Sequence, residues 1–186
     1  MVAKNLKAVP RAAKEIQVVV RSKSTDTDQY WTSWIWDEAK PLWLVICNYP
    51  SNNSPWYLDV TKMLIIDHVM EADGGGVIVG NLFSRPISKP TDVNLARVAS
   101  PEALQELADI AKIAKYIVNG TGSLTAKSKV AQSQMKALIG KLTKAKLNDR
   151  VCTLVNGKNY RGAHPLSLQG LRWFYKVDGK VSDRLA

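Results

Sequence analysis

The chain has 186 residues, of which 46% are hydrophobic, and a formal net charge of +10. This composition excludes intrinsic disorder and allows one ordinary domain with a buried core. It also excludes a membrane-spanning helix, because no apolar run approaches the roughly 18 to 20 residues that such a helix needs.

The first residues form a basic segment, residues 1–14, with four cationic side chains, Lys4, Lys7, Arg11 and Lys14. This segment lacks the apolar core of a secretory signal, so we interpret it as a flexible arm, with an organellar transit peptide as the alternative. The two cysteines, Cys47 and Cys152, are too far apart in sequence to suggest a disulfide framework. We therefore predict an intracellular protein, in the cytoplasm or in a nucleoprotein particle.

Strand signals dominate residues 15–99, which are also acidic and rich in tryptophan. Runs of β-branched, alternating or continuously apolar residues predict strands at 15–21, 40–48, 56–70 and 77–83. The three glycines at 74–76 indicate a turn, so the last two segments are predicted to pair as a hairpin. This half is predicted to hold four or five mostly antiparallel strands.

The hydrophobic period changes at residue 100. Ser100 is a favourable N-cap, and Pro101 suits the first helical position. Apolar residues then recur at spacings of three and four up to Val118, and a second such pattern begins at Ser123. Residues 100–147 are therefore predicted to form an amphipathic helical hairpin.

Residues 148–186 are predicted to be a basic tail of mixed structure that packs on the rest. A strand is expected at 150–155 and a short helix at 167–177, with turns at Asn156-Gly157 and Asp178-Gly179. The whole is predicted to be an α+β fold in which residues 15–186 make one compact domain.

Charge is distributed very unevenly along the chain. Residues 24–110 carry five basic and twelve acidic side chains, a net charge of −7, whereas residues 111–150 carry nine basic and one acidic, a net charge of +8. On a helical wheel Lys129, Lys136 and Lys144 lie opposite the apolar stripe, with Lys141 beside them, and no glutamate is spaced to pair with them. Such a face attracts nucleic-acid phosphates, and the alternatives are plain solvation or docking on an acidic protein surface.

Six tryptophans are many for a chain of this length. Trp31, Trp34 and Trp36 have acidic neighbours, which favours contact with a protein partner or with another copy over contact with phosphates. Trp173 and Tyr175 lie between Arg172 and Lys176, so they are better candidates for stacking on bases, with core packing as the alternative.

Four carboxylates, Asp59, Asp67, Glu71 and Asp73, could hold a divalent cation in a metal-dependent nuclease if residues 65–73 were a strand. A polar strand end before a Gly-rich turn explains the same residues more simply. His164 could act as a general base, but the sequence places no activated nucleophile beside it. A loop histidine whose hydrogen bonds are satisfied explains this residue more simply. No phosphate loop and no nucleophile elbow is present, and we predict no cofactor and no bound metal.

The sequence favours a non-enzymatic protein that binds nucleic acid with little sequence preference, as a subunit of a nucleoprotein or viral assembly. The residues predicted to contact nucleic acid are Lys129, Lys136, Lys141, Lys144, Arg150, Arg172, Trp173, Tyr175 and Lys176. A structural protein that assembles through its oppositely charged halves is the first alternative, and the metal-dependent nuclease is the second.

Overall fold

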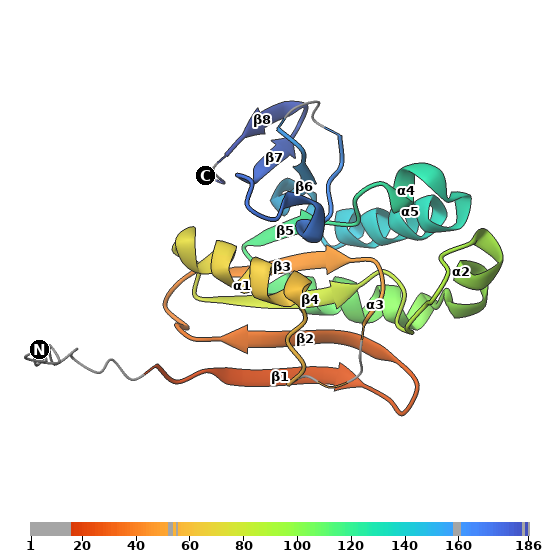
Figure 1. Cartoon of the computed structure of the whole chain (residues 1–186), viewed down its shortest axis with the longest axis horizontal. Helices are drawn as coiled ribbons and strands as arrows, with labels where there is room; N and C mark the ends of the chain where they lie inside the picture. Colours follow the sequence, from red (N-terminus) through yellow and green to blue (C-terminus); the bar gives the residue numbers. More distant parts are fainter. Residues whose placement is uncertain (1–15, 52–53, 55, 158–160, 184, 186) are drawn as a thin grey trace, which may run out of the picture.

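An eight-stranded mixed sheet organises the fold (Figure 1). The computed structural model describes residues 16–51, 54, 56–157, 161–183 and 185. The strands lie in the order β1-β2-β4-β3-β5-β6-β7-β8; the four in the middle are parallel, and the outer ones pair antiparallel. Their bounds are β1 Val19–Ser24, β2 Gln29–Ile35, β3 Leu42–Cys47, β4 Gly76–Asn81, β5 Tyr116–Asn119, β6 Val151–Val155, β7 Phe174–Val177 and β8 Lys180–Ser182.

Helices cover both faces of the sheet (Figure 1). α1 (Val60–Glu71) packs on one face through Ile65 and Val69. α3 (Pro101–Ile110) and α5 (Lys129–Lys144) pack on the other through Leu107 and Leu138. The shorter helices are α2 (Asp92–Val98), α4 (Leu124–Lys127), η1 (Ala111–Ile113), η2 (Asn148–Arg150) and η3 (Pro165–Leu168).

The continuous apolar run of β3 follows from its central position. Leu44 and Ile46 face the core under α3 and α5, whereas Trp43 and Val45 face the core under α1. A parallel strand with helices on both sides must be apolar on both faces, and for this reason its sequence does not alternate. None of the helices in the described ranges combines the length and the apolarity that crossing a bilayer requires.

The predicted mixture of helices and strands is confirmed, whereas the predicted number of strands is too low. The strands predicted at 40–48, 77–83 and 150–155 correspond to β3, β4 and β6. Asp178 and Gly179 form the predicted turn, with positive φ at both residues, between β7 and β8. β2, β5, β7 and β8 were not predicted, because β2 is rich in aromatics and the other three are only three or four residues long.

The strand predicted at 56–70, and with it the hairpin across the three glycines, is wrong. Residues 60–71 are helix α1, which begins at the N-cap Asp59, whose carboxylate accepts a hydrogen bond from the Lys62 backbone at 2.9 Å. Ile65 and Val69, spaced by four residues, are buried and mark the core side of this helix. β3 and β4 are therefore parallel strands connected through α1.

The predicted helical hairpin at 100–147 is only partly right. α3 does begin after the Ser100 cap, whose hydroxyl accepts the Ala103 N–H at 3.3 Å, and it packs against α5. However, α3 ends at Ile110, and residues 116–119 form β5 in the middle of the sheet. The two helices are thus separated by a strand, because Ile117 and Val118 are buried on opposite faces between β3 and β6.

The helix predicted at 167–177 is also wrong. The 3-10 helix η3 already ends at Leu168, and residues 174–177 form β7. Trp173 and Tyr175 are both buried against α1. This explains the extended conformation, since side chains two residues apart share one face of a strand.

Candidate functional site

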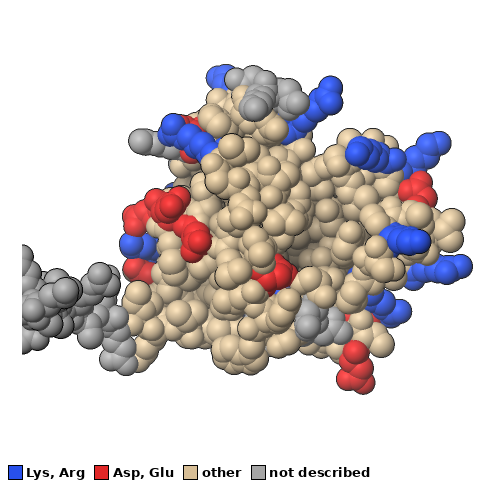
Figure 2. Space-filling view, in the orientation of Figure 1, with Lys and Arg blue, Asp and Glu red and all other residues tan. Residues whose placement is uncertain are grey.

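The two strands that follow β3 in the chain lie on opposite sides of it. From β3 the chain passes through α1 to β4 on one side, whereas the next parallel strand, β5, pairs with β3 on the other side. Such a switch point leaves a crevice beyond the strand ends, where open α/β sheets bind ligands. Two adjoining cavities of about 340 and 600 Å³ lie there and share Asn48, Tyr49 and His164 in their walls. Figure 2 shows the hollow beside the lobe that carries α4 and α5.

We call the smaller cavity the inner pocket. Its walls include Gln29, Asn48 and Asn81, which begin β2, follow β3 and end β4. The Gln29 side chain is buried, and its Nε2 donates to Thr32 Oγ1 at 3.1 Å. Gln29 Oε1 and Asn48 Oδ1 are both buried and accept no hydrogen bond from any described residue. Because burying an unpaired acceptor is costly, these two oxygens are the groups of the inner pocket that would gain from N–H or O–H donors of a ligand.

A buried ammonium group lies in the wall of the same pocket. Lys62 is only 6% exposed, and its Nζ donates to the Tyr57 carbonyl oxygen at 2.8 Å and lies 4.0 Å from Asp59 Oδ2. Burial lowers the pKa of Lys62, and the Asp59 carboxylate opposes that change. Ser51 Oγ in turn donates to Asp59. The inner pocket therefore holds a carboxylate and an ammonium group side by side.

His164 lies between the two cavities at the start of η3. Its Nδ1 accepts the N–H of Leu166 at 3.3 Å, so the neutral ring carries its proton on Nε2. Burial lowers the pKa of His164, and Asp59 partly opposes this change. The lowered pKa favours the neutral imidazole, whose Nε2–H could donate a hydrogen bond to a ligand in the cleft.

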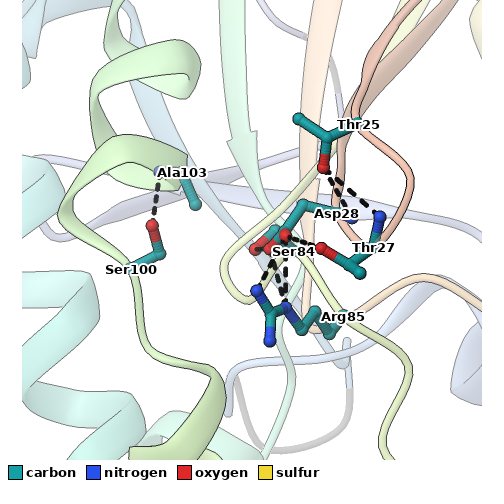
Figure 3. Close-up of polar contacts among 7 residues, drawn as sticks. All are labelled: Thr25, Thr27, Asp28, Ser84, Arg85, Ser100 and Ala103. Atoms are coloured by element: carbon teal, nitrogen blue, oxygen red, sulfur yellow. Dashed lines mark hydrogen bonds and ion pairs between the residues drawn. The ribbon is translucent and has the colours of Figure 1, made fainter.

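A polar network holds the start of β2, and thus Gln29, in place (Figure 3). The Asp28 carboxylate accepts hydrogen bonds from the Arg85 guanidinium at 3.0–3.2 Å and from Ser84 and Thr27 at 2.6 Å. The backbone N–H of Gln29 donates to the Ser84 carbonyl at 2.7 Å. Hydrogen bonds from Arg85 hold the pKa of Asp28 far below its usual range, against the effect of its burial.

Replacing Asp28 by asparagine is expected to lower the free energy of unfolding at pH 7 by about 2 kcal/mol, the usual size of hydrogen bonds to a charged group. The low pKa of folded Asp28 means that its contribution is complete above the unfolded value of about 3.9 and is lost as the pH falls further. Urea unfolding at pH 7 and pH 3 measures this, and the difference between variant and parent should shrink at pH 3. The exposed neighbour Asp26 gives the control Asp26→Asn, and an equal loss in both variants would contradict the assignment.

A row of exposed lysines begins at the larger of the two cavities, which we call the outer cavity. Lys127 lines that cavity, and Lys129, Lys136 and Lys144 follow along α5, a helix of 16 residues and about 24 Å. We call these last three the lysine row. No ion pair with a carboxylate forms at any of the four within the described ranges. Figure 2 shows cationic groups at this edge, over α4 and α5.

Of the other charged residues predicted to bind nucleic acid, Lys141 lies in α5 but contacts α3, and the rest lie outside this helix. Lys141 is half-buried and donates to Gln105 at 2.7 Å. Arg150 donates to the Ala114 carbonyl at 3.0 Å, near the amino end of β5. Arg172 pairs with Asp183, and Lys176 is exposed on β7.

The aromatic candidates are mostly part of the core. Trp173 is buried and stacks on His68 with 4.1 Å between ring centroids, and Tyr175 is buried beside them, so neither has a free face for a base. Trp34 is buried as well, and Trp31 and Trp36 are half-buried against the two cores. The surface that Trp31, Trp34 and Trp36 offer to a partner is correspondingly small.

The structure does not assemble the predicted carboxylate cluster. Asp67, Glu71 and Asp73 belong to α1 and the turn after it, so the strand that would have put them on one face is absent. No group of three or more metal-binding side chains occurs in the part of the chain that the structure describes. Asp59 caps α1 instead, and the predicted basic arm with Lys4, Lys7, Arg11 and Lys14 lies outside the described residues.

Sequence reasoning missed Gln29, Asn48, Lys62 and Asn81. One signal was available: an asparagine ends or directly follows each of the three strands β3, β4 and β5. Polar residues at the carboxyl ends of buried strands are typical of binding sites in parallel sheets.

The fold and the cleft define an α+β protein with a polar cleft at the carboxyl ends of its parallel strands. Residues 29–166 match the family described as protein of unknown function (DUF1643), and the chain belongs to this family. The matched region begins at Gln29 and includes His164, so it spans the whole inner pocket. A search of curated proteins gives no match, and a search of solved structures gives none either.

Proposed function

We propose that this protein binds nucleic acid, with phosphates along the lysine row and one base in the inner pocket. The observation that carries the proposal is the continuity between a row of lysines without ion pairs and a cleft with unpaired buried acceptors. A protein of this kind would serve as a component of a nucleoprotein assembly.

The two parts of the site suit the two parts of a nucleotide. Phosphate oxygens are acceptors without donors, so they are attracted to exposed ammonium groups and gain nothing from Gln29 Oε1 or Asn48 Oδ1. Nucleobases carry N–H donors on their edges, and these can satisfy carboxamide oxygens. A cavity of about 340 Å³ lies within the usual size range of small-ligand pockets and admits one base.

The alternative partner is an acidic protein surface, which would use the lysines but not the unpaired acceptors of the inner pocket. Lysine side chains alone would bind a carboxylate-rich surface as well as a phosphate backbone, because the ammonium group acts as a point charge toward either anion. The unpaired acceptors in the adjoining pocket favour a ligand that brings donors together with anions, which describes a nucleotide chain.

Fluorescence anisotropy with a labelled 20-nucleotide single strand of mixed sequence tests the proposal. Affinity should fall steeply between about 50 and 500 mM salt, because counterions are released on binding. Absence of binding at 50 mM salt, or an affinity that does not change with salt, would overturn the proposal.

Asn48→Ala removes one of the unpaired acceptors and is expected to weaken binding of the same strand about fivefold, the value of one hydrogen bond. The slope of log affinity against log salt should stay the same, because the phosphate contacts remain. Asn148→Ala, at an exposed asparagine in η2, is the control and should bind like the parent. Equal affinities of the Asn48 variant and the parent would place the base elsewhere.

A further inference from the structure

One tryptophan of this chain is largely exposed. Trp56 has 76% of its surface accessible, and Tyr57 and Leu58 after it have 50% and 42%. The other five tryptophans are buried or half-buried. Because large apolar side chains are unfavourable in water, two exposed rings followed by an exposed leucine indicate a surface that is covered when the protein works.

This aromatic segment, Trp56–Leu58, adjoins the inner pocket. It lies between Ser51 and Asp59, which both line that pocket, on the connection from β3 to α1. Lys62 links the two, because its Nζ donates to the Tyr57 carbonyl and lies 5.9 Å from the centroid of the Tyr57 ring. Tyr57 thus contacts the buried ammonium group of the pocket wall, and Trp56 directly precedes it in the chain.

We infer that Trp56 and Tyr57 stack on an unpaired base next to the one in the inner pocket, so that the preferred ligand is single-stranded nucleic acid. This inference rests on the proposed function. Base–aromatic stacking accepts any base, which agrees with binding of little sequence preference. In a duplex the bases already stack on their neighbours, so exposed rings give no comparable gain there.

A protein partner fits this patch less well. Stable protein interfaces bury about 800 Å² on each side, from roughly 20 to 30 residues, whereas the aromatic segment and the first turn of α1 together offer only a few exposed apolar side chains, namely those of Trp56, Tyr57, Leu58, Val60 and Met63. A base needs only one ring to stack on, so a segment of this size is sufficient for it.

The test compares two labelled probes, a 20-nucleotide single strand of mixed sequence and an abasic strand with the same number of phosphates. The parent chain should bind the strand with bases at least about tenfold more tightly. Trp56→Ala should lose about 5- to 100-fold in affinity for the strand with bases and almost nothing for the abasic one. Trp56→Phe should restore most of the difference, because a ring remains.

Ile113→Ala removes an apolar side chain of 56% exposure at the other end of the sheet, and it should change neither affinity. Thermal unfolding of each variant checks that the fold is intact, which is expected at so exposed a position as Trp56. If Trp56→Ala keeps the parent's preference for bases, the stacking inference fails while the proposed function stands. If the parent binds neither probe at 50 mM salt, the proposed function fails and this inference with it.

Discussion

A variant with glutamine at Lys129, Lys136 and Lys144 is expected to bind the 20-nucleotide single strand about 100-fold more weakly than the parent in 50 mM salt. Each lysine that neutralises a phosphate contributes about 0.7 to the slope of log affinity against log salt on single strands. The three exposed side chains of the lysine row form no ion pair with a described carboxylate, so each is available for such a contact. Anisotropy titrations at several salt concentrations should show the slope falling by about 2.

A variant with the same loss of charge at another place provides the control. Lys112, Lys115 and Lys180 are exposed near the amino end of β5 and on β8, away from the cleft. Their triple replacement by glutamine changes the net charge equally, so it separates a local contact from general attraction. If both triple variants lose affinity to the same degree, the lysine row is not the binding surface.

Gly75→Ala is expected to lower the free energy of unfolding by about 3 kcal/mol, the upper part of the range for overpacked sites. A Cβ at this position would lie 1.9 Å from the carbonyl oxygen of Asp37 and 2.8 Å from the Lys40 side chain. The backbone must therefore move, which breaks the hydrogen bonds that the N–H groups of Trp36 and Asp37 donate to the Gly75 carbonyl at 2.9 and 2.8 Å. Urea unfolding followed by tryptophan fluorescence measures the loss.

Gly140→Ala is the matched control for this substitution. Gly140 lies in α5, and an added Cβ there meets no atom within 4 Å. Alanine is the better helix former, so this variant should gain about 0.5 to 1 kcal/mol. A Gly75 variant as stable as the parent would show that the close approach of the two backbones is not required.

Local signals in the sequence determined several elements without help from the rest of the chain. The apolar runs of β3 and β4 are strands because every residue in them is suited to burial. Ser100 ends one segment and starts α3 by accepting a nearby N–H, and Asp178-Gly179 forms a hairpin turn through its backbone conformation. The spacing of α5 likewise predicts its apolar and its lysine-bearing sides, since both depend only on the helical repeat.

Tertiary structure decided the elements whose local pattern was compatible with two conformations. The spacing of Ala111, Ala114 and Val118 continues the helical pattern of α3, yet the chain leaves the helix at Ile110 to form β5. The gap between β3 and β6 can be filled only by a strand that is apolar on both faces, and Ile117 and Val118 supply it. The triple glycine reads as a hairpin turn, but Gly75 is needed where one backbone approaches another.

The candidate site is the part that the sequence alone determined least. Gln29, Asn48, Lys62 and His164 are separated by long stretches of chain, and only the strand order of the sheet brings them to one crevice. Burial then gives these groups their chemistry, because it leaves carboxamide oxygens unpaired and lowers the pKa of His164. Composition and helical repeat predict a cationic helix face, whereas a pocket forms only when distant residues are packed together and shielded from water.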